Sequence, residues 1–253
     1  MIDLHCHLLP GVDDGSRSVE QSVRVLEAMR EGGVTAVCLT PHHSVGRLAG
    51  GLPLAHDLAF AELNARAPDA ITLYRGVELM LDRPVPADLL EHPGIRLGDS
   101  HCLLVEFTRG VAVPAISNAL RQITQLGLLP VLAHPERYVG CRPAAVQEWK
   151  ATGAVMQVDA TTLLTARGRG QRARELIAHG LADIIAADNH GDDRMIGAGY
   201  RYLCEQGGEH QADLLARRNP AALLADEKPE PVPPLALKTP LFDRLKQLLG
   251  EDE

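Results

Sequence analysis

The chain has 253 residues, 45% hydrophobic and 23% charged, with a formal net charge of −8. This length suits one large domain such as an α/β barrel. The acidic balance argues against nucleic acid as the main partner, because phosphate backbones are bound by basic stripes. One local exception is the basic run ARGRGQRAR (Arg167, Arg169, Arg172 and Arg174). We interpret it as a solvated helix start or as a subunit contact of a homo-oligomer.

The cysteines and the apolar segments bear on the compartment. Five cysteines without paired spacing are typical of reduced intracellular thiols. No signal peptide is visible, and no apolar run reaches the roughly 18 residues that a membrane-spanning helix needs. We therefore expect a cytoplasmic protein without membrane insertion.

Short apolar segments alternate with longer segments of helical periodicity. Several short segments are apolar throughout, as in parallel strands that are covered on both faces. We predict strands at 2–7, 34–40, 71–77, 102–107, 129–133, 154–159 and 183–188, and helices at 18–31, 53–67, 113–126, 143–151, 171–180 and 208–217. Seven βα units predict a distorted (β/α)7 TIM-like barrel, with an open doubly wound sheet as the alternative.

The C-terminal segment has a different composition. Residues 225–240 are rich in proline and predict an extended linker. Residues 241–253 predict a short amphipathic helix with an acidic end. We therefore expect the barrel over residues 1–225, and a proline-rich linker with a short C-terminal helix over residues 226–253.

Side chains that bind metals follow six of the seven predicted strands. His5 and His7 share one face of the first strand, because side chains at i and i+2 point the same way. The carboxyl ends of barrel strands meet on one rim, so distant segments are expected to converge there. The candidate ligands are His5, His7, Asp14, His42, Glu78, Glu106, His134, Asp188 and His190. The sixth strand ends at Asp159, to which we assign no role.

The donor atoms of this set suggest the metal and the chemistry. Nitrogen and oxygen donors without thiolates favour Mn²⁺, Fe or Zn²⁺. Nine ligands exceed the needs of one ion, so two or three ions are expected. Such ions lower the pKa of bound water toward about 7. They also bind the attacking oxygen and the leaving oxygen when a phosphate ester is cleaved. In the loops after the fifth and seventh strands, Arg137 and Arg194 could bind phosphate oxygens. Either Asp13 or Asp14 could be a ligand, and the other could accept a hydrogen bond from a histidine.

Other catalytic chemistries lack their motifs in this chain. No cysteine is followed six positions later by the arginine of a thiol-based tyrosine phosphatase. A Gly-x-x-x-x-Gly-Lys phosphate loop and a Gly-x-Ser-x-Gly nucleophile motif are both absent from the sequence. The predicted strand ends also lack the lysine that many amidohydrolase barrels place between two metals.

Seven segments together resemble the PHP (polymerase and histidinol phosphatase) superfamily: MIDLHCHLLPGVDDG, LTPHH, GVEL, LLVEF, HPERY, GAVMQVDATTL and HGLADIIAADNH. Within it, the chain is most similar over about residues 1–225 to the CpsB/CapC group, the manganese-dependent protein-tyrosine phosphatases of capsule and exopolysaccharide operons. The resemblance implies a PHP-type barrel with three divalent ions, Mn²⁺ in the first place, on the nine candidate ligands. It also implies that Arg137 and Arg194 bind the substrate phosphate.

The resemblance further implies a function and a partner. The enzyme would hydrolyse phosphotyrosine with a metal-activated water, on a protein such as the tail of a bacterial tyrosine kinase that controls polysaccharide export. One alternative is a small-molecule phosphatase of the histidinol phosphate type or a promiscuous phosphoesterase, and a second is a non-catalytic metal-binding regulator. The motif ADNHGDDR departs from the family pattern, which has serine before the aspartate and one more residue before the arginine.

Overall fold

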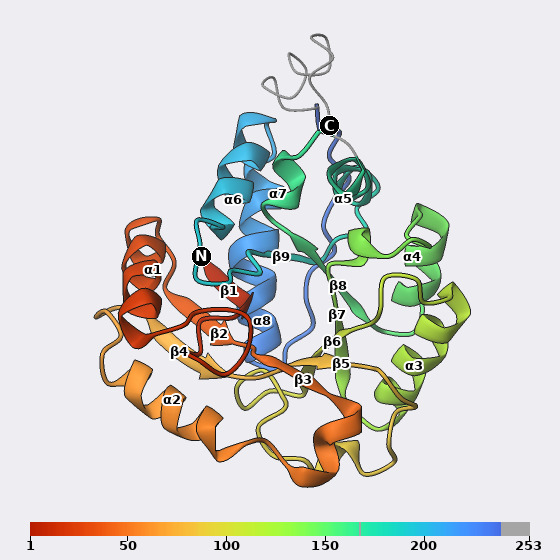
Figure 1. Cartoon of the computed structure of the whole chain (residues 1–253). Helices are drawn as coiled ribbons and strands as arrows, with labels where there is room; N and C mark the ends of the chain where they lie inside the picture. The colour runs from red at the N-terminus through yellow and green to blue at the C-terminus, as the bar shows by residue number, and fades with distance from the viewer. Residues whose placement is uncertain (167, 239–253) are drawn as a thin grey trace.

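The computed structural model describes residues 1–166 and 168–238, and every strand pair in these parts is parallel. The strands form a three-stranded sheet in the order β1-β2-β4 and a six-stranded sheet in the order β3-β5-β6-β7-β8-β9 (Figure 1). They are β1 (Ile2–Cys6), β2 (Ala36–Leu39), β3 (His42–Ser44), β4 (Thr72–Arg75), β5 (Glu78–Met80), β6 (Cys102–Glu106), β7 (Leu129–Ala133), β8 (Val155–Asp159) and β9 (Ile184–Ala186).

The two sheets are parts of one barrel. Strand β2 continues into β3 after Thr40 and Pro41, and β4 continues into β5 after Gly76 and Val77. Pro41 has no N–H for the strand ladder, which interrupts the strand at this point. The backbone N–H of Glu78 still donates to the Pro41 carbonyl at 3.1 Å, so the two halves stay aligned. The nine short strands therefore occupy seven barrel positions, which confirms the predicted distorted (β/α)7 barrel.

The first and last strands meet at the seam of the barrel. The Asp188 N–H donates to the His5 carbonyl at 3.0 Å, and the His7 N–H donates to the Asn189 carbonyl at 2.7 Å. An isolated parallel bridge joins Cys6 to Asn189. The seam therefore brings the first motif, around His5 and His7, next to the last motif, around Asp188.

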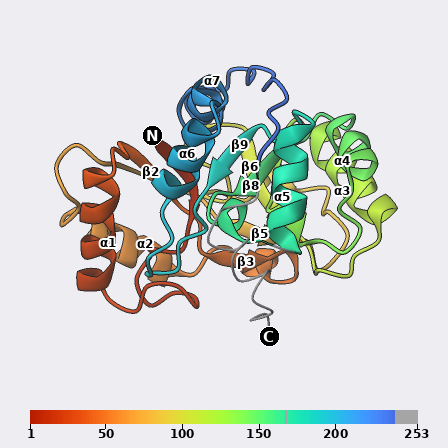
Figure 2. The same cartoon turned by 90° about the horizontal axis from the view of Figure 1, so that it is seen from above.

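Helices surround the strands (Figure 2). They are α1 (Val19–Glu31), α2 (Leu54–Asn64), α3 (Val113–Gln125), α4 (Pro143–Lys150), α5 (Arg169–Ala178), α6 (Ile196–Glu205), α7 (Glu209–Asp213) and α8 (Asn219–Leu224), with a π-helical turn at Leu214–Arg218. The sequence pattern misses α6, because Gly197 and Gly199 weaken its helical signal. Gly199 is needed for packing, since a Cβ there would lie 2.7 Å from the Ala160 carbonyl oxygen. None of the described helices is long and apolar enough to cross a membrane.

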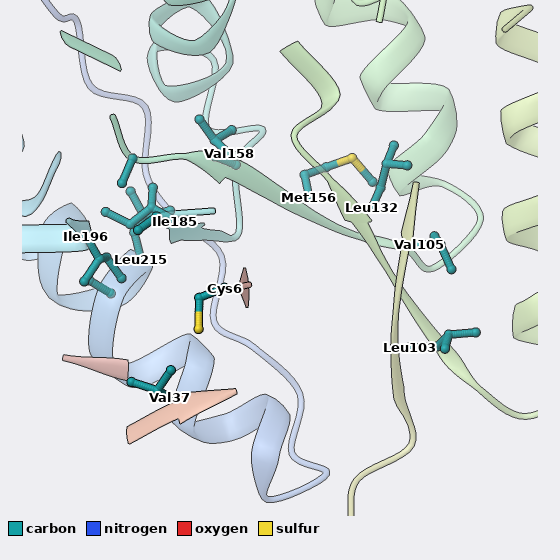
Figure 3. Packing of buried hydrophobic residues seen from close by; sticks show 14 of the residues in the cluster. Cys6, Val37, Leu103, Val105, Leu132, Met156, Val158, Ile185, Ile196 and Leu215 are labelled. Carbon is teal, nitrogen blue, oxygen red and sulfur yellow. The ribbon is translucent and has the colours of Figure 1, made fainter. Parts of the chain in front are cut away.

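Aliphatic side chains fill the space between strands and helices (Figure 3). Fully buried members from β6, β7 and β8 are Leu103, Val105, Leu132, Met156 and Val158. A smaller cluster contains Leu4 of β1 and Leu104 of β6 together with Leu223 of α8. These side chains bury both faces of the strands. The packing fixes the positions of the carboxyl ends of the strands.

The proline-rich segment lies against the barrel. Residues 227–238 have no helix or strand. Val232 is buried, and the Leu235 N–H donates to the Ile177 carbonyl at 3.3 Å. The Asn219 side chain donates to the Glu230 carbonyl and accepts from the Glu230 N–H, at 2.9 and 2.8 Å. The extended linker stays a prediction, and the predicted helix over 241–253 lies outside the described residues.

Candidate metal centre

Four buried side chains converge at the centre of the barrel rim. The Nε2 atoms of His5 and His7 are 3.2 Å apart. Glu78 Oε2 lies 3.3 and 3.4 Å from these two nitrogens, and Asp188 Oδ1 lies 3.3 and 3.2 Å from them. Ligand atoms that bind one ion at about 2.0–2.2 Å stand roughly 3.0–3.5 Å apart. The four atoms therefore have the spacing of a single metal site.

Two further groups share residues with this first site. His42 Nδ1 lies 2.9 Å from Glu78 Oε2 and 3.2 Å from Glu106 Oε1. Asp14 Oδ1 lies 3.4 Å from His42 Nε2 and 3.5 Å from His190 Nε2. The three groups with the spacing of metal ligands are His5–His7–Glu78–Asp188, His7–Asp14–His42–His190 and His42–Glu78–Glu106.

His134 completes the connected cluster, with Nε2 at 2.9 Å from Glu78 Oε1. The structure thus brings all nine candidate ligands together. Two buried atoms of the cluster, Glu78 Oε2 and His134 Nδ1, have no hydrogen-bond partner among the described residues. Buried polar atoms nearly always have a hydrogen-bond partner. Unpaired acceptors among clustered histidines and carboxylates are therefore what a site that binds cations would present.

Asp13 and Asp14 have different positions in the cluster. Asp13 Oδ2 accepts hydrogen bonds from His7 Nδ1 at 2.7 Å and from the His42 N–H at 3.0 Å. Asp13 therefore lies behind His7 and fixes its ring, as carboxylates behind metal-binding histidines do. Asp14 is exposed and faces His42 and His190. Of the two, Asp14 is the one with an oxygen free for an ion.

Both candidate phosphate-binding arginines lie beside this cluster. Arg137 donates to Asp159 at 2.8 Å and also contacts Asp188. Its Nε is buried and has no hydrogen-bond partner among the described residues, and the side chain lines the pocket described below. Arg194 pairs with Asp192 at 2.8 Å and lies 3.8 Å from Asp188 Oδ2. Arg137 is therefore held more firmly at the cluster than Arg194.

The cluster forms one wall of a pocket of about 880 Å³. Ligand pockets of roughly 300–1,000 Å³ hold molecules of drug size, so this space exceeds what a phosphate group alone requires. The side chains of Met80, Phe107 and Tyr138 also line it. An aromatic or peptide group attached to a phosphate would have room beside the cluster.

Comparisons with known proteins show the family of the chain. A family model described as capsular polysaccharide synthesis, CpsB/CapC, matches residues 1–225. The chain belongs to the CpsB/CapC family. The tyrosine-protein phosphatase YwqE of Bacillus subtilis is 32% identical over 198 residues, which cover 75% of this chain and 77% of YwqE. The tyrosine-protein phosphatase CpsB of Streptococcus pneumoniae is 27% identical over 243 residues, which cover 90% of this chain and 99% of CpsB.

Solved structures give the same grouping. A crystal structure from work on YwqE of Bacillus subtilis and CpsB of Streptococcus pneumoniae, described as metal-dependent tyrosine phosphatases, has a TM-score of 0.80 and 25% identity. The match covers 94% of this chain and all of that chain. An organophosphorus hydrolase from Deinococcus radiodurans, with a TM-score of 0.54 and 15% identity, covers 88% of this chain and 92% of its own. That second likeness shows the fold alone.

Two buried polar residues of β8 that our sequence interpretation left without a role contact this CpsB/CapC cluster. Gln157 Oε1 lies 2.9 Å from His5 Nδ1 and thereby orients the ring. Asp159 Oδ2 accepts from Arg137, while its other oxygen accepts from the Thr161 N–H at 2.8 Å. Asp159 is thus a fixed support for Arg137. The signal that could have identified Gln157 is a polar residue inside the otherwise apolar strand VMQVD.

The basic run after β8 needs a correction. The prediction that a helix starts in this run is confirmed, because α5 begins at Arg169. However, Arg174 is buried and donates to backbone carbonyls, and Arg172 also donates to a carbonyl, at 2.7 Å. Arg169 lines the pocket, and Arg167 lies outside the described residues. Two of these arginines therefore bind the protein's own backbone: Arg174 donates to carbonyls of the loop after β8, and Arg172 donates to the Glu136 carbonyl after β7.

Gly15 is required by the close approach of its loop to β1. A Cβ at this position would lie 2.0 Å from the His7 carbonyl oxygen, and the Gly15 N–H donates to Asp13 at 3.0 Å. We expect Gly15→Ala to displace the loop that carries Asp13 and Asp14, to weaken Mn²⁺ binding at least about tenfold, and to cost about 1–3 kcal/mol of stability. Mn²⁺ titration and thermal denaturation measure both effects.

Gly50→Ala is the matched control for this substitution, since a Cβ there meets nothing within 4 Å. Its Mn²⁺ affinity and melting temperature should equal those of the unchanged protein. Unaltered Mn²⁺ affinity in Gly15→Ala would contradict the role that we give to this loop.

The charges of the cluster predict how the stability of the metal-free protein depends on pH. Burial disfavours the charged ring of His42, but the hydrogen bond to Glu106 and the negative charge of Glu78 outweigh this and raise its pKa to about 10. Burial raises the pKa of Asp13, but the hydrogen bond from His7 outweighs it and lowers the pKa to about 2. The His42 contribution is complete below about pH 6.5 and is lost as the pH rises through 10. The Asp13 contribution is complete above about pH 4 and is lost as the pH falls toward 2.

In EDTA, we therefore expect a lower melting temperature at pH 9 than at pH 6. Saturating Mn²⁺ should reverse this trend between pH 6 and 8, because metals bind the deprotonated histidines. Thermal melts monitored by circular dichroism, with EDTA or Mn²⁺ across this range, measure both trends. A metal-free protein that becomes more stable from pH 6.5 to pH 9 would show that these ion pairs do not stabilise the fold.

Proposed function

We propose that this chain is a metal-dependent protein-tyrosine phosphatase that regulates capsule or exopolysaccharide synthesis. The observation that carries the proposal is the connected cluster of nine candidate ligands beside Arg137, eight in groups with metal-ligand spacing and His134 next to Glu78, in a pocket larger than a phosphate. Membership of the CpsB/CapC family and the names of its relatives support the same activity. A metal-dependent phosphoric monoester hydrolase is the enzyme class that this combination favours.

We propose that the cluster holds three divalent ions, with Mn²⁺ as the natural metal and Fe or Zn²⁺ as alternatives. The donor set, imidazole nitrogens and carboxylate oxygens without thiolates, suits these ions. The ligands would be His5, His7, Asp14, His42, Glu78, Glu106, His134, Asp188 and His190. When bound, such ions supply an activated water and neutralise charge on the phosphate.

The protein's own side chains would position the phosphate. Arg137 lines the pocket, and Asp159 keeps its guanidinium in place. Arg194, which lies 3.8 Å from the same Asp188 oxygen that Arg137 contacts, would bind a second phosphate oxygen. Guanidinium groups suit this role because their donors match the oxygens of a phosphate. They would also stabilise the charge that builds up as the phenol leaves.

The natural substrate in this proposal is a phosphotyrosine protein, in particular the tail of a bacterial tyrosine kinase. The pocket is open enough to admit a side chain together with its backbone. The cytoplasmic location and the formation of a homo-oligomer stay predictions of the sequence.

The test is the hydrolysis of p-nitrophenyl phosphate and of a phosphotyrosine peptide after chelation and again after Mn²⁺ is restored, with histidinol phosphate assayed alongside. Activity on both aryl substrates that returns only with metal is expected. Activity confined to histidinol phosphate would favour a small-molecule phosphatase instead. Metal binding without any turnover would identify a regulator.

A further inference from the structure

The mouth of the pocket carries an excess of positive charge that the phosphate site does not use. Four exposed arginines line it beyond the two already described, and each comes from a different loop at the carboxyl end of the strands. They are Arg47 after β3, Arg83 after β5, Arg109 after β6, and Arg169 at the start of α5. The chain as a whole has a net charge of −8, so the positive charge of this part of the pocket is opposite in sign to the charge of the whole protein.

These four side chains, which we call the rim arginines, lack counter-ions of their own. None of them forms an ion pair with a described residue, whereas Arg137 and Arg194 do. Partial burial and the charges of Arg109 and Arg137 lower the pKa of Arg169, as expected for clustered cations. The exposed carboxylates of the lining are Asp14, which faces two histidines, and Asp82, which accepts from the Gly46 N–H at 3.0 Å.

Unpaired arginines that surround a phosphate site favour a substrate with more than one negative group. The pocket volume of about 880 Å³ leaves space for residues next to the phosphotyrosine. Arginine binds both carboxylates and phosphates through paired donors. A cleft lined by one sign of charge also raises the rate at which oppositely charged ligands arrive.

We propose that the rim arginines select phosphotyrosine segments flanked by negatively charged side chains. This inference rests on the proposed phosphatase function and names the sequence context of its substrate. The flanking charge could come from aspartate and glutamate or from a second phosphorylated residue, because both present oxygen pairs to a guanidinium.

The experiment compares four substrates at low salt with Mn²⁺ present: a phosphotyrosine peptide flanked by glutamates, its glutamine counterpart, a counterpart with a flanking phosphoserine, and p-nitrophenyl phosphate. We expect kcat/KM for at least one acidic peptide to exceed that of the glutamine peptide about tenfold. The preference should shrink toward one at 0.5 M salt, where exposed charges are screened. The two acidic peptides distinguish carboxylate from phosphate as the recognised group.

The variant R47Q/R83Q/R109Q/R169Q tests the rim arginines as a set, since exposed ion pairs are individually weak. We expect it to lose most of the preference for acidic over glutamine peptide, chiefly through KM. The matched control is R24Q/R30Q/R121Q/R142Q, which removes the same charge from exposed arginines outside the pocket lining and should keep the preference.

The outcomes separate this inference from the proposed function. Equal kcat/KM for acidic and glutamine peptides in the unchanged protein, with normal Mn²⁺-dependent turnover, would overturn the inference alone. A preference that survives in the rim variant, or that disappears equally in the control variant, would also overturn it. No turnover of any aryl phosphate would remove the proposed function and this inference with it. A preference of the unchanged protein that does not shrink at about 0.5 M salt would also overturn the inference, even where the rim variant fails to fold.

Discussion

Glu78→Gln is expected to abolish Mn²⁺-dependent phosphatase activity, with a loss in kcat/KM of at least about 10³-fold. This exceeds the roughly 10–100-fold loss that is typical when a residue that only hydrogen-bonds to a metal ligand is changed. Glu78 is the carboxylate that most of the cluster shares. Its oxygens lie within 3.4 Å of His5, His7, His42 and His134. Glutamine keeps the size of the side chain but removes the charge that balances these rings, so ion binding should fail first.

Mn²⁺ binding by calorimetry and turnover of p-nitrophenyl phosphate measure this effect together. Circular dichroism should show a folded protein, because Glu78 begins β5 through its backbone. Glu62→Gln on the exposed surface of α2 makes the same change in charge and serves as the control. Full Mn²⁺ affinity in Glu78→Gln would show that the cluster does not bind metal in the way that we propose.

Arg137→Lys is expected to lower kcat/KM for phosphotyrosine about 10²-fold, the lower end of the effect of losing one donor to a reacting oxyanion. Lysine keeps the positive charge but lacks the planar guanidinium that contacts Asp159 and Asp188 and presents several fixed donors toward a phosphate. Inhibition by inorganic phosphate should weaken by a similar factor, because phosphate would use the same donors.

Steady-state kinetics with phosphate as a competitive inhibitor provide the measurement. Arg121→Lys on the exposed face of α3 is the matched control, and its kinetics should not change. An unchanged inhibition constant for phosphate in Arg137→Lys would exclude Arg137 from phosphate binding and shift that role to Arg194.

Backbone strain marks two positions of the cluster. His134 and Asp188 have positive φ angles of 32° and 49°, in the left-handed region that costs a non-glycine residue about 1–3 kcal/mol. Hydrogen bonds hold both in place, from the Arg137 N–H to the His134 carbonyl at 2.9 Å and from the Asp188 N–H to the His5 carbonyl. Such strain is typical of functional sites, but no sequence pattern signals it.

Sequence patterns predict the barrel and the residues that form the cluster. Apolar strands such as CLLVE are buried throughout, and parallel strands expose their carboxyl ends on one rim, so residues after strands could be collected before any contact was known. The local pattern also placed α1, where the Ser18 side chain accepts from the Gln21 N–H at 3.2 Å as its cap. These features depend on neighbours within a few residues, which a sequence displays directly.

The arrangement of the residues within the cluster follows from tertiary contacts. The separate positions of Asp13 and Asp14 follow from the fold of one loop over His7, and the support of Arg137 by Asp159 joins residues that are 22 positions apart. The unpaired arginines at the pocket mouth come from four loops, one of which we had interpreted as a solvated helix start. Contacts between distant segments depend on barrel closure between β1 and β9, and closure is a property of the whole chain rather than of any segment.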